Sequence, residues 1–94
     1  MLGSGAAFAQ LRQIPDEAKR GHIRHLNEMI VDISGTPARL SAGAQIRSRE
    51  NRIVLPAALP AEGELVKFLV DQAGQVHRVW ILTEEEAAKP DKRN

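Results

Sequence analysis

The chain has 94 residues, 43% of them hydrophobic, and a formal net charge of +1. This length allows a single domain with a modest core, and the near-neutral charge excludes a strong overall field that would attract polyanions. Because there is no cysteine, disulfides, thiolate metal sites and thiol nucleophiles are excluded as well. No run reaches the roughly 18 apolar residues of a membrane-spanning helix, so we expect no membrane span.

The first ten residues, MLGSGAAFAQ, are uncharged and mostly small or apolar. Ala7-Phe8-Ala9 matches the small-x-small pattern after which signal peptidase cuts, and Gln10 would then be the first mature residue. A basic region and a long apolar run are missing, so we interpret residues 1–9 as the remnant of an export signal. This interpretation predicts a periplasmic or secreted protein. If Ala7-Phe8-Ala9 is not a cleavage site, the start is an alanine-rich N-terminus and the protein is expected in the cytoplasm.

Residues 10–20 are predicted to form an N-terminal arm with a short helix. Pro15-Asp16-Glu17-Ala18-Lys19-Arg20 begins with proline and acids, ends with bases, and is followed by Gly21. This order complements a helix dipole and supports one or two helical turns.

From residue 21 the composition becomes strand-like, with short apolar runs separated by turn residues. The extended segments predicted in the first half of the chain are 21–26, 28–33, 38–41 and 45–49, and residues 52–55 form a short apolar piece that Pro56 ends. Asn27 and Ser34-Gly35-Thr36-Pro37 mark turns between them. Pro56 and Pro60 interrupt the stretch that follows, which predicts a loop or a single helical turn there.

The strongest pattern is a hairpin over residues 63–83. Two runs rich in Val, Leu, Ile and aromatic residues flank Asp71-Gln72-Ala73-Gly74, which places a glycine where a hairpin needs positive φ. Period-two alternation in the first arm indicates a half-buried strand. Thr83-Glu84-Glu85-Glu86 then has the spacing of a capping box, and residues 84–94 are predicted as a short helix and a polar tail.

Residues 21–83 are therefore predicted as one mainly all-β domain, a small five- to six-stranded antiparallel OB-like barrel with short helical turns at either end. A closed sheet is favoured because it removes exposed edges from so short a chain. The order of these features, from Gly21-His22-Ile23 to Val76-His77-Arg78-Val79-Trp80-Ile81-Leu82-Thr83, resembles an uncharacterised family of small exported proteobacterial proteins, similar to small periplasmic OB-like barrel domains. The resemblance implies export and a barrel-like fold, and no known activity or catalytic residues.

Three histidines, His22, His25 and His77, are candidate metal ligands, since imidazole suits zinc, copper or nickel. His22 and His25 are three apart on a predicted strand, so an unbroken pleat points them to opposite faces. We therefore favour solvent-facing histidines over a metal site, and we predict no cofactor.

Arginines supply the other candidate site. Arg39, Arg47, Arg49 and Arg52 are opposed only by Glu50, which gives residues 39–52 a local charge of +3. Arg47 and Arg49 are predicted to share one strand face, where guanidinium forks suit phosphate or carboxylate groups. The candidate ligand-binding residues are Arg47, Arg49, Arg52, Arg78 and Trp80. Because single-strand binding relies on several stacking aromatics, an ordinary solvated arginine face is favoured over an oligonucleotide site.

Trp80 shares strand parity with Val76 and Leu82 and is predicted to pack in an apolar cluster. No serine lies in a Gly-x-Ser-x-Gly elbow, and no phosphate loop is present, so we do not expect an enzyme. The preferred hypothesis is a non-enzymatic exported barrel that binds a protein or an anionic ligand of the cell envelope, as a monomer or weak dimer. The alternatives are an anion- or oligonucleotide-binding domain and a histidine-based periplasmic metal binder.

Overall fold

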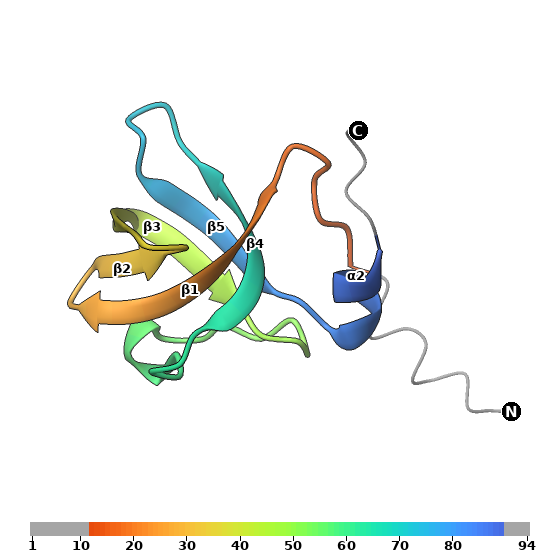
Figure 1. Ribbon diagram of the computed structural model, residues 1–94. Coiled ribbons are helices and arrows are strands. Elements are labelled where there is room, and N and C mark those ends of the chain that lie inside the picture. The colour runs from red at the N-terminus through yellow and green to blue at the C-terminus, as the bar shows by residue number, and fades with distance from the viewer. Residues whose placement is uncertain (1–11, 90–94) are drawn as a thin grey trace, which may run out of the picture.

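The computed structural model describes residues 12–89 (Figure 1). The elements in chain order are β1 (Lys19–Asn27), β2 (Ile30–Ile33), β3 (Thr36–Arg47), the 3-10 turn η1 (Pro56–Ala58), β4 (Glu64–Val70), β5 (Val76–Ile81) and α2 (Glu84–Ala88). The strands form a closed barrel in the order β1-β2-β3-β5-β4, and β4 pairs with β1 to complete the ring. The predicted mainly-β barrel is thus confirmed, with five strands.

One strand pair departs from the predicted antiparallel barrel. β3 and β5 are parallel, whereas the other four neighbouring pairs are antiparallel. In a closed ring with an odd number of strands, directions cannot alternate all the way round, so at least one pair must be parallel. The chain makes this pair by crossing over from the end of β3 to β4 through residues 48–63. The barrel is therefore mixed.

Two of the predicted turns lie where the sequence places them. Ser34 and Gly35 both have positive φ, 52° and 92°, and join the paired residues Ile33 and Thr36 in a two-residue hairpin turn. Gly74, with φ of 84°, lies in the connection between β4 and β5, which confirms the hairpin over residues 63–83. The segment after Pro56 forms the expected single helical turn.

Three predicted boundaries are wrong. Asn27, predicted as a turn, is the last residue of β1, and Glu28 and Met29 form the turn to β2. The short helix expected over residues 15–20 is a single turn, closed by the Ala18 N–H donating to the Pro15 carbonyl at 3.1 Å. Lys19 and Arg20 already belong to β1, where they pair with Phe68 and Lys67 of β4, so sheet pairing overrides the local helix signal. The segments predicted at 38–41 and 45–49 are one long strand, β3, which ends at Arg47.

All five strands contribute side chains to the hydrophobic core. Its fully buried members, less than 2% exposed, are Ile23, Val31, Val66, Val76 and Val79. Leu59, which follows η1, joins this cluster with 6% exposure. Burying an aliphatic side chain of this size stabilises the fold by roughly 1.5–3 kcal/mol. The barrel interior is therefore packed with branched aliphatic residues.

A bulge in β5 reverses the predicted environment of Trp80. Leu69 of β4 pairs with Arg78, but the next residue, Val70, pairs with Val76, so His77 is an extra residue in β5. Such a bulge shifts the alternation by one residue. Val76 and Val79 both face the core, and Trp80 lies half-buried on the outer surface.

A second layer lies outside the barrel wall. Figure 1 shows α2 beside the segment that leads into β1. Ala18 and Leu82 are buried at 7% and 3% exposure, although neither belongs to the core cluster inside the barrel. The predicted capping box is present, because the Thr83 hydroxyl accepts from the Glu86 N–H and the Glu86 carboxylate accepts from the Thr83 N–H. Neither helical element within residues 12–89 combines the length and apolar character needed to cross a membrane.

Candidate functional site at the barrel mouth

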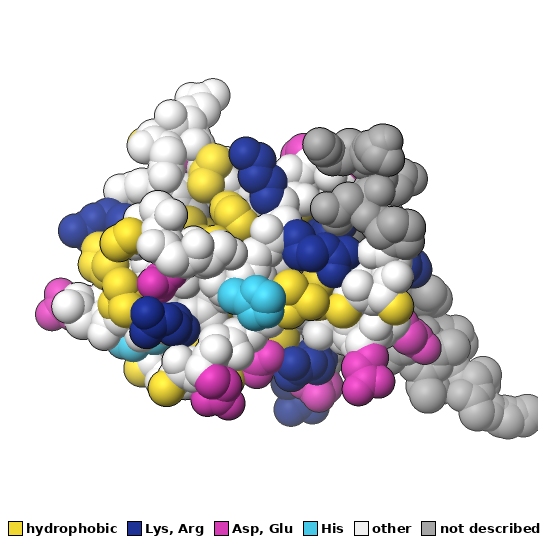
Figure 2. All heavy atoms as spheres, viewed as in Figure 1, with side chains coloured by type: hydrophobic (Ala, Val, Ile, Leu, Met, Phe, Trp, Pro, Cys, Tyr) yellow, Lys and Arg dark blue, Asp and Glu magenta, His cyan; other side chains and the backbone are white. Residues whose placement is uncertain are grey.

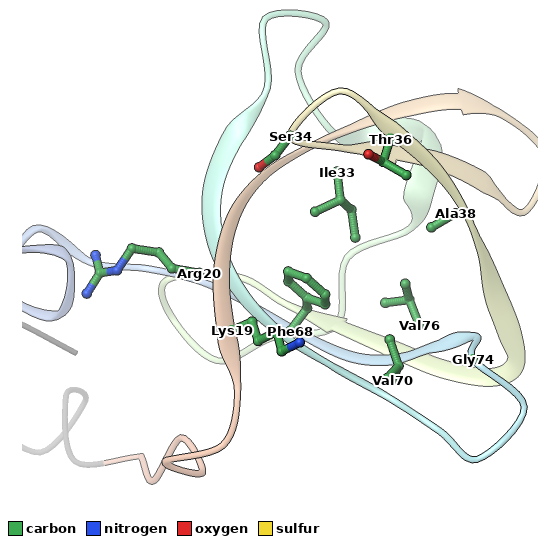
Figure 3. A pocket seen from close by; sticks show the side chains of 10 residues that line it. All are labelled: Lys19, Arg20, Ile33, Ser34, Thr36, Ala38, Phe68, Val70, Gly74 and Val76. Atoms are coloured by element: carbon green, nitrogen blue, oxygen red, sulfur yellow. The ribbon is translucent and has the colours of Figure 1, made fainter. Parts of the chain in front are cut away.

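A cavity of about 330 Å³ opens at one end of the barrel. It lies among the start of β1, the β2–β3 turn, the end of β4 and the start of β5 (Figure 3). Five of its lining side chains are apolar and come from four strands: Ile33, Ala38, Phe68, Val70 and Val76. Figure 2 shows hydrophobic side chains at the surface between the β4–β5 hairpin and the start of β1, next to a lysine or arginine. We call this cavity the barrel mouth.

The two ends of the barrel differ because of the crossover. The chain leaves β3 and enters β4 at the end opposite the barrel mouth, and Leu59 of this crossover enters the core there. At the barrel mouth, only the two-residue β2–β3 turn and the β4–β5 connection join the strands. Because both connections are short, the aromatic ring of Phe68 and the side chain of Val76 line an open cavity (Figure 3).

The charged residues that line the barrel mouth are all basic. Its lining contains Lys19 and Arg20 and no aspartate or glutamate. Figure 3 shows the Lys19 side chain beside Phe68 at the rim, whereas Arg20 points away from the cavity. Arg20 donates to the carbonyls of Ala87 and Lys89 at 3.0 and 2.7 Å. Within residues 12–89, the Lys19 ammonium has no hydrogen bond or ion pair, so it is the cation at the rim that can meet a ligand.

Hydroxyl groups complete the rim. The Ser34 Oγ accepts a hydrogen bond from the His22 N–H at 3.1 Å, which leaves its own O–H as a donor. Thr36 is exposed at the start of β3 and also lines the cavity. An apolar floor with a few polar groups at the edge is the common composition of small-molecule sites.

Most of the predicted arginine site is occupied by contacts within the protein. Arg49 lies beyond the end of β3, so it does not share a strand face with Arg47. Its guanidinium donates to Glu64 Oε1 at 2.6 Å and to the Leu82 carbonyl at 3.1 Å. These contacts anchor the crossover to the barrel, and the predicted shared face is wrong.

Two other predicted arginines also bind the protein's own oxygens. Arg47 donates to the Asn51 carbonyl at 3.0 Å and to Gln45 Oε1 at 3.2 Å. Arg78 donates to the carbonyls of Gly43 and His77. Of the four predicted arginines, Arg52 alone has an exposed side chain without a hydrogen bond or ion pair in the described part of the chain.

Trp80 lies in a row of cationic residues on the outside of the barrel. In the sheet register it is flanked by Arg47 on β3 and by Lys67 on β4, and Lys67 is in turn opposite Arg20 on β1. Directly opposed residues share a face, so these side chains lie on the outer wall. This row is near α2, because Arg20 binds its C-terminal carbonyls.

The three histidines do not converge. His25 Nε2 is 2.9 Å from the Glu28 carbonyl oxygen, His77 Nδ1 is 3.1 Å from the Ser41 hydroxyl, and His22 is exposed on β1. Figure 2 shows histidines at two separate places on one face. In residues 12–89 no group of three or more His, Cys, Asp or Glu side chains could hold a metal ion. The geometry gives the histidine metal hypothesis no support.

Sequence patterns do not reveal that residues from distant strands meet at the barrel mouth. The local pattern predicts Lys19 at the end of a helical turn, whereas its position at the rim follows from its pairing with Phe68, which is 49 residues away in the sequence. Ser41, which is 7% exposed, and its contact with His77 were also missed, since they depend on the parallel β3–β5 pair.

Comparisons with known proteins add no family assignment. No protein-family model, no curated protein and no solved structure matches the chain. The predicted resemblance is therefore supported at the level of a small five-stranded β-barrel, and no family or homologue is identified.

Proposed function

We propose that this barrel is a non-enzymatic binding module and that its ligand enters the barrel mouth. The ligand class is a small amphipathic anion, with an apolar body in the cavity and a carboxylate or phosphate at the rim. The observation that carries the proposal is an apolar cavity of about 330 Å³ with one available cation, Lys19, at its rim and no acidic residue in its lining.

Size and chemistry both support this ligand class. A volume near 300 Å³ is at the lower end of the range for small-molecule sites. Phe68, Val70 and Val76 offer apolar contact, and Lys19 offers a compact charge on a flexible stem. The hydroxyls of Ser34 and Thr36 can donate to the same anionic group. A neutral apolar ligand would leave these rim groups unused.

Calorimetric titration of the full chain with octanoate and with uncharged 1-octanol tests the proposal. Octanoate should bind more tightly than octanol. Lys19→Glu should weaken the binding of octanoate about two- to fivefold, the range expected for an exposed ion pair, and should leave the binding of octanol unchanged. Arg39→Glu is the matched control, because Arg39 is an exposed cation of β3 outside the cavity lining. Equal weakening by both variants, or no heat with either ligand, would contradict the proposal.

Export is the second part of the proposal. Its support is the Ala7-Phe8-Ala9 pattern, which lies outside the described residues. The mass of the mature protein purified from cells tests it. A chain beginning at Gln10 in the envelope fraction is the expected result, and a chain that retains Met1 in the cytoplasmic fraction would overturn this part.

Polyanion binding through the arginines is a weaker candidate, since Arg47, Arg49 and Arg78 already bind oxygens of the protein. Titration with a labelled oligonucleotide at two salt concentrations distinguishes it. A steep salt dependence is the signature of phosphate binding. We expect no binding at low salt.

A further inference from the structure

A short extended segment lies against the end of β3, within the crossover. The Ser48 N–H donates to the Arg52 carbonyl at 2.7 Å, and the Val54 N–H donates to the Ile46 carbonyl at 2.8 Å. These two hydrogen bonds flank the antiparallel pair formed by Arg47 and Ile53. Residues 52–55 therefore act as a short extra strand at the edge of the barrel wall, which we call the edge segment.

The outer side of the edge segment has unpaired backbone groups. Successive residues in a strand direct their N–H and C=O groups to opposite sides, so those of Ile53 point away from β3. No hydrogen bond within residues 12–89 uses the N–H or the C=O of Ile53. An edge of this kind is a template for pairing with another extended chain.

The side chains of the edge segment alternate. Ile53 and Leu55 are 56% and 71% exposed, whereas Val54 between them is partly buried against the core. Single exposed aliphatic residues are common on protein surfaces. Two of them on one face of an unpaired edge form a surface that an apolar, extended partner fits.

The charge at the edge segment is positive. The Arg52 side chain is exposed and has no hydrogen bond or ion pair in the described part of the chain. Glu50, the nearest acid in the sequence, accepts a hydrogen bond from the Ser48 hydroxyl at 3.1 Å. Arg49 is already paired with Glu64. A partner with a carboxylate opposite Arg52 would be the complement of this charge.

We propose that the edge segment binds an extended acidic peptide by strand addition. The peptide pairs antiparallel, so that one of its residues exchanges two hydrogen bonds with the N–H and C=O of Ile53. Its side chains opposite Ile53 and Leu55 are apolar, and the residue opposite Arg52 is Asp or Glu. A second copy of this chain fits less well, because two-fold pairing about Ile53 would set the two Arg52 side chains diagonally on one face without a counter-charge.

The pairing fixes a sequence pattern for the partner. In the antiparallel direction, the peptide reads apolar, any residue, apolar, acid, with the second apolar residue opposite Ile53. A capped peptide, acetyl-Thr-Val-Thr-Val-Glu-Thr-amide, is the probe. Replacing its glutamate by lysine tests the charge, and N-methylation of its second valine removes one backbone donor without changing a side chain.

The experiment is a titration of the labelled full-length chain with this peptide, followed by two-dimensional amide spectroscopy. The expected result is a saturable shift of the Ile53 and Leu55 amides. Affinity should fall about two- to fivefold with the lysine peptide and should be lost with the N-methylated one. Arg52→Glu should reverse the preference so that the lysine peptide binds better. The Arg39→Glu variant is the control and should behave like the wild type.

Three results would overturn the proposal. They are the absence of shifts at residues 52–55 up to millimolar peptide, equal binding of the N-methylated peptide, and shifts of Ile53 that depend on protein concentration without peptide. The last result would assign the edge segment to a second copy of the chain. None of these outcomes bears on the barrel mouth, because the edge segment and the cavity lining share no residue.

Discussion

Arg12 and Glu86 lie 74 positions apart in the sequence and are joined by two hydrogen bonds, Nε to Oε2 at 3.1 Å and Nη2 to Oε1 at 2.9 Å. The Arg12 side chain is only 6% exposed, and it also donates to the carbonyls of Ser48 and Ile81, each at 2.6 Å. One guanidinium thus joins the N-terminal segment, the end of β3, the end of β5 and α2. Its planar set of donors suits this role, which a lysine could not fill.

Replacing Arg12 should destabilise the fold strongly. Arg12→Ala removes the partner of a largely buried carboxylate and leaves two carbonyls without their donor, so we expect a loss of about 2–4 kcal/mol in the free energy of unfolding. Urea unfolding measures this loss of stability. Arg24→Ala is the matched control, because the Arg24–Asp32 pair at 3.2 Å has an arginine side chain that is 49% exposed, and its loss should cost less than about 1 kcal/mol. Equal effects of the two variants would refute the central role of Arg12.

Glu86 should make stability depend on pH. Burial raises its pKa, but this effect is outweighed by the hydrogen bonds from Arg12 and Thr83, so the pKa of Glu86 is lowered from its ordinary value of 4.5. The unfolded chain therefore takes up the proton first as the pH falls. The stabilisation is present above about pH 4.5 and is lost as the pH falls through the lowered pKa.

Glu86→Gln isolates this contribution. The wild type should be more stable than the variant at pH 7, and the difference should shrink below pH 4.5. Unfolding free energies measured by urea titration at several pH values give the comparison. A difference that stays constant down to pH 3 would show that the ionisation of Glu86 does not stabilise the fold.

Gly21 is predicted to be intolerant of a side chain. A Cβ atom there would lie 3.0 Å from Ile33 Cγ2 and 3.3 Å from Phe68 Cε1, which is closer than ordinary van der Waals contact. Gly21→Ala should therefore cost about 1–3 kcal/mol through overpacking. Gly43→Ala is the control, since a Cβ there meets nothing within 4 Å and its φ is not in the left-handed region. Thermal unfolding of the two variants provides the measurement. A Gly21→Ala variant as stable as the wild type would contradict this packing.

Leu59 should be essential for closing the end of the barrel opposite the mouth. Leu59→Ala should destabilise the protein by about 2–5 kcal/mol, because it removes a core side chain and leaves a cavity. Leu55→Ala is a matched change in the same crossover at 71% exposure and should alter stability by no more than about 0.5 kcal/mol. Chemical unfolding distinguishes the two variants. Similar losses of stability would mean that Leu59 does not close this end of the barrel.

Local signals predicted much of the fold. The hairpin over residues 63–83, the turn at Ser34 and Gly35 and the capping box at Thr83 each depend on a few neighbouring residues, and each is present. A closed sheet followed from the need to remove edges in a chain of this length.

The features that the sequence did not reveal depend on distant partners. The bulge at His77 is set by the pairing of β5 with β4, and it moved Trp80 from the predicted apolar cluster to the outer wall. The alternating pattern predicts Arg49 on a strand face because it continues past Arg47, where β3 ends. The position of Lys19 at the rim likewise depends on strands that are far apart in the sequence. The alternation of apolar and polar residues shows which face of a strand is buried. It does not give the register between strands that are distant in the sequence.

The most direct test of the binding proposal is an amide spectrum of the full chain recorded during titration with octanoate. We expect saturable shifts confined to residues around the barrel mouth, among them Lys19, Ser34 and Val76, and weaker shifts in Lys19→Glu. Shifts centred on Arg47 and Arg49, or a spectrum that does not change up to millimolar octanoate, would contradict it.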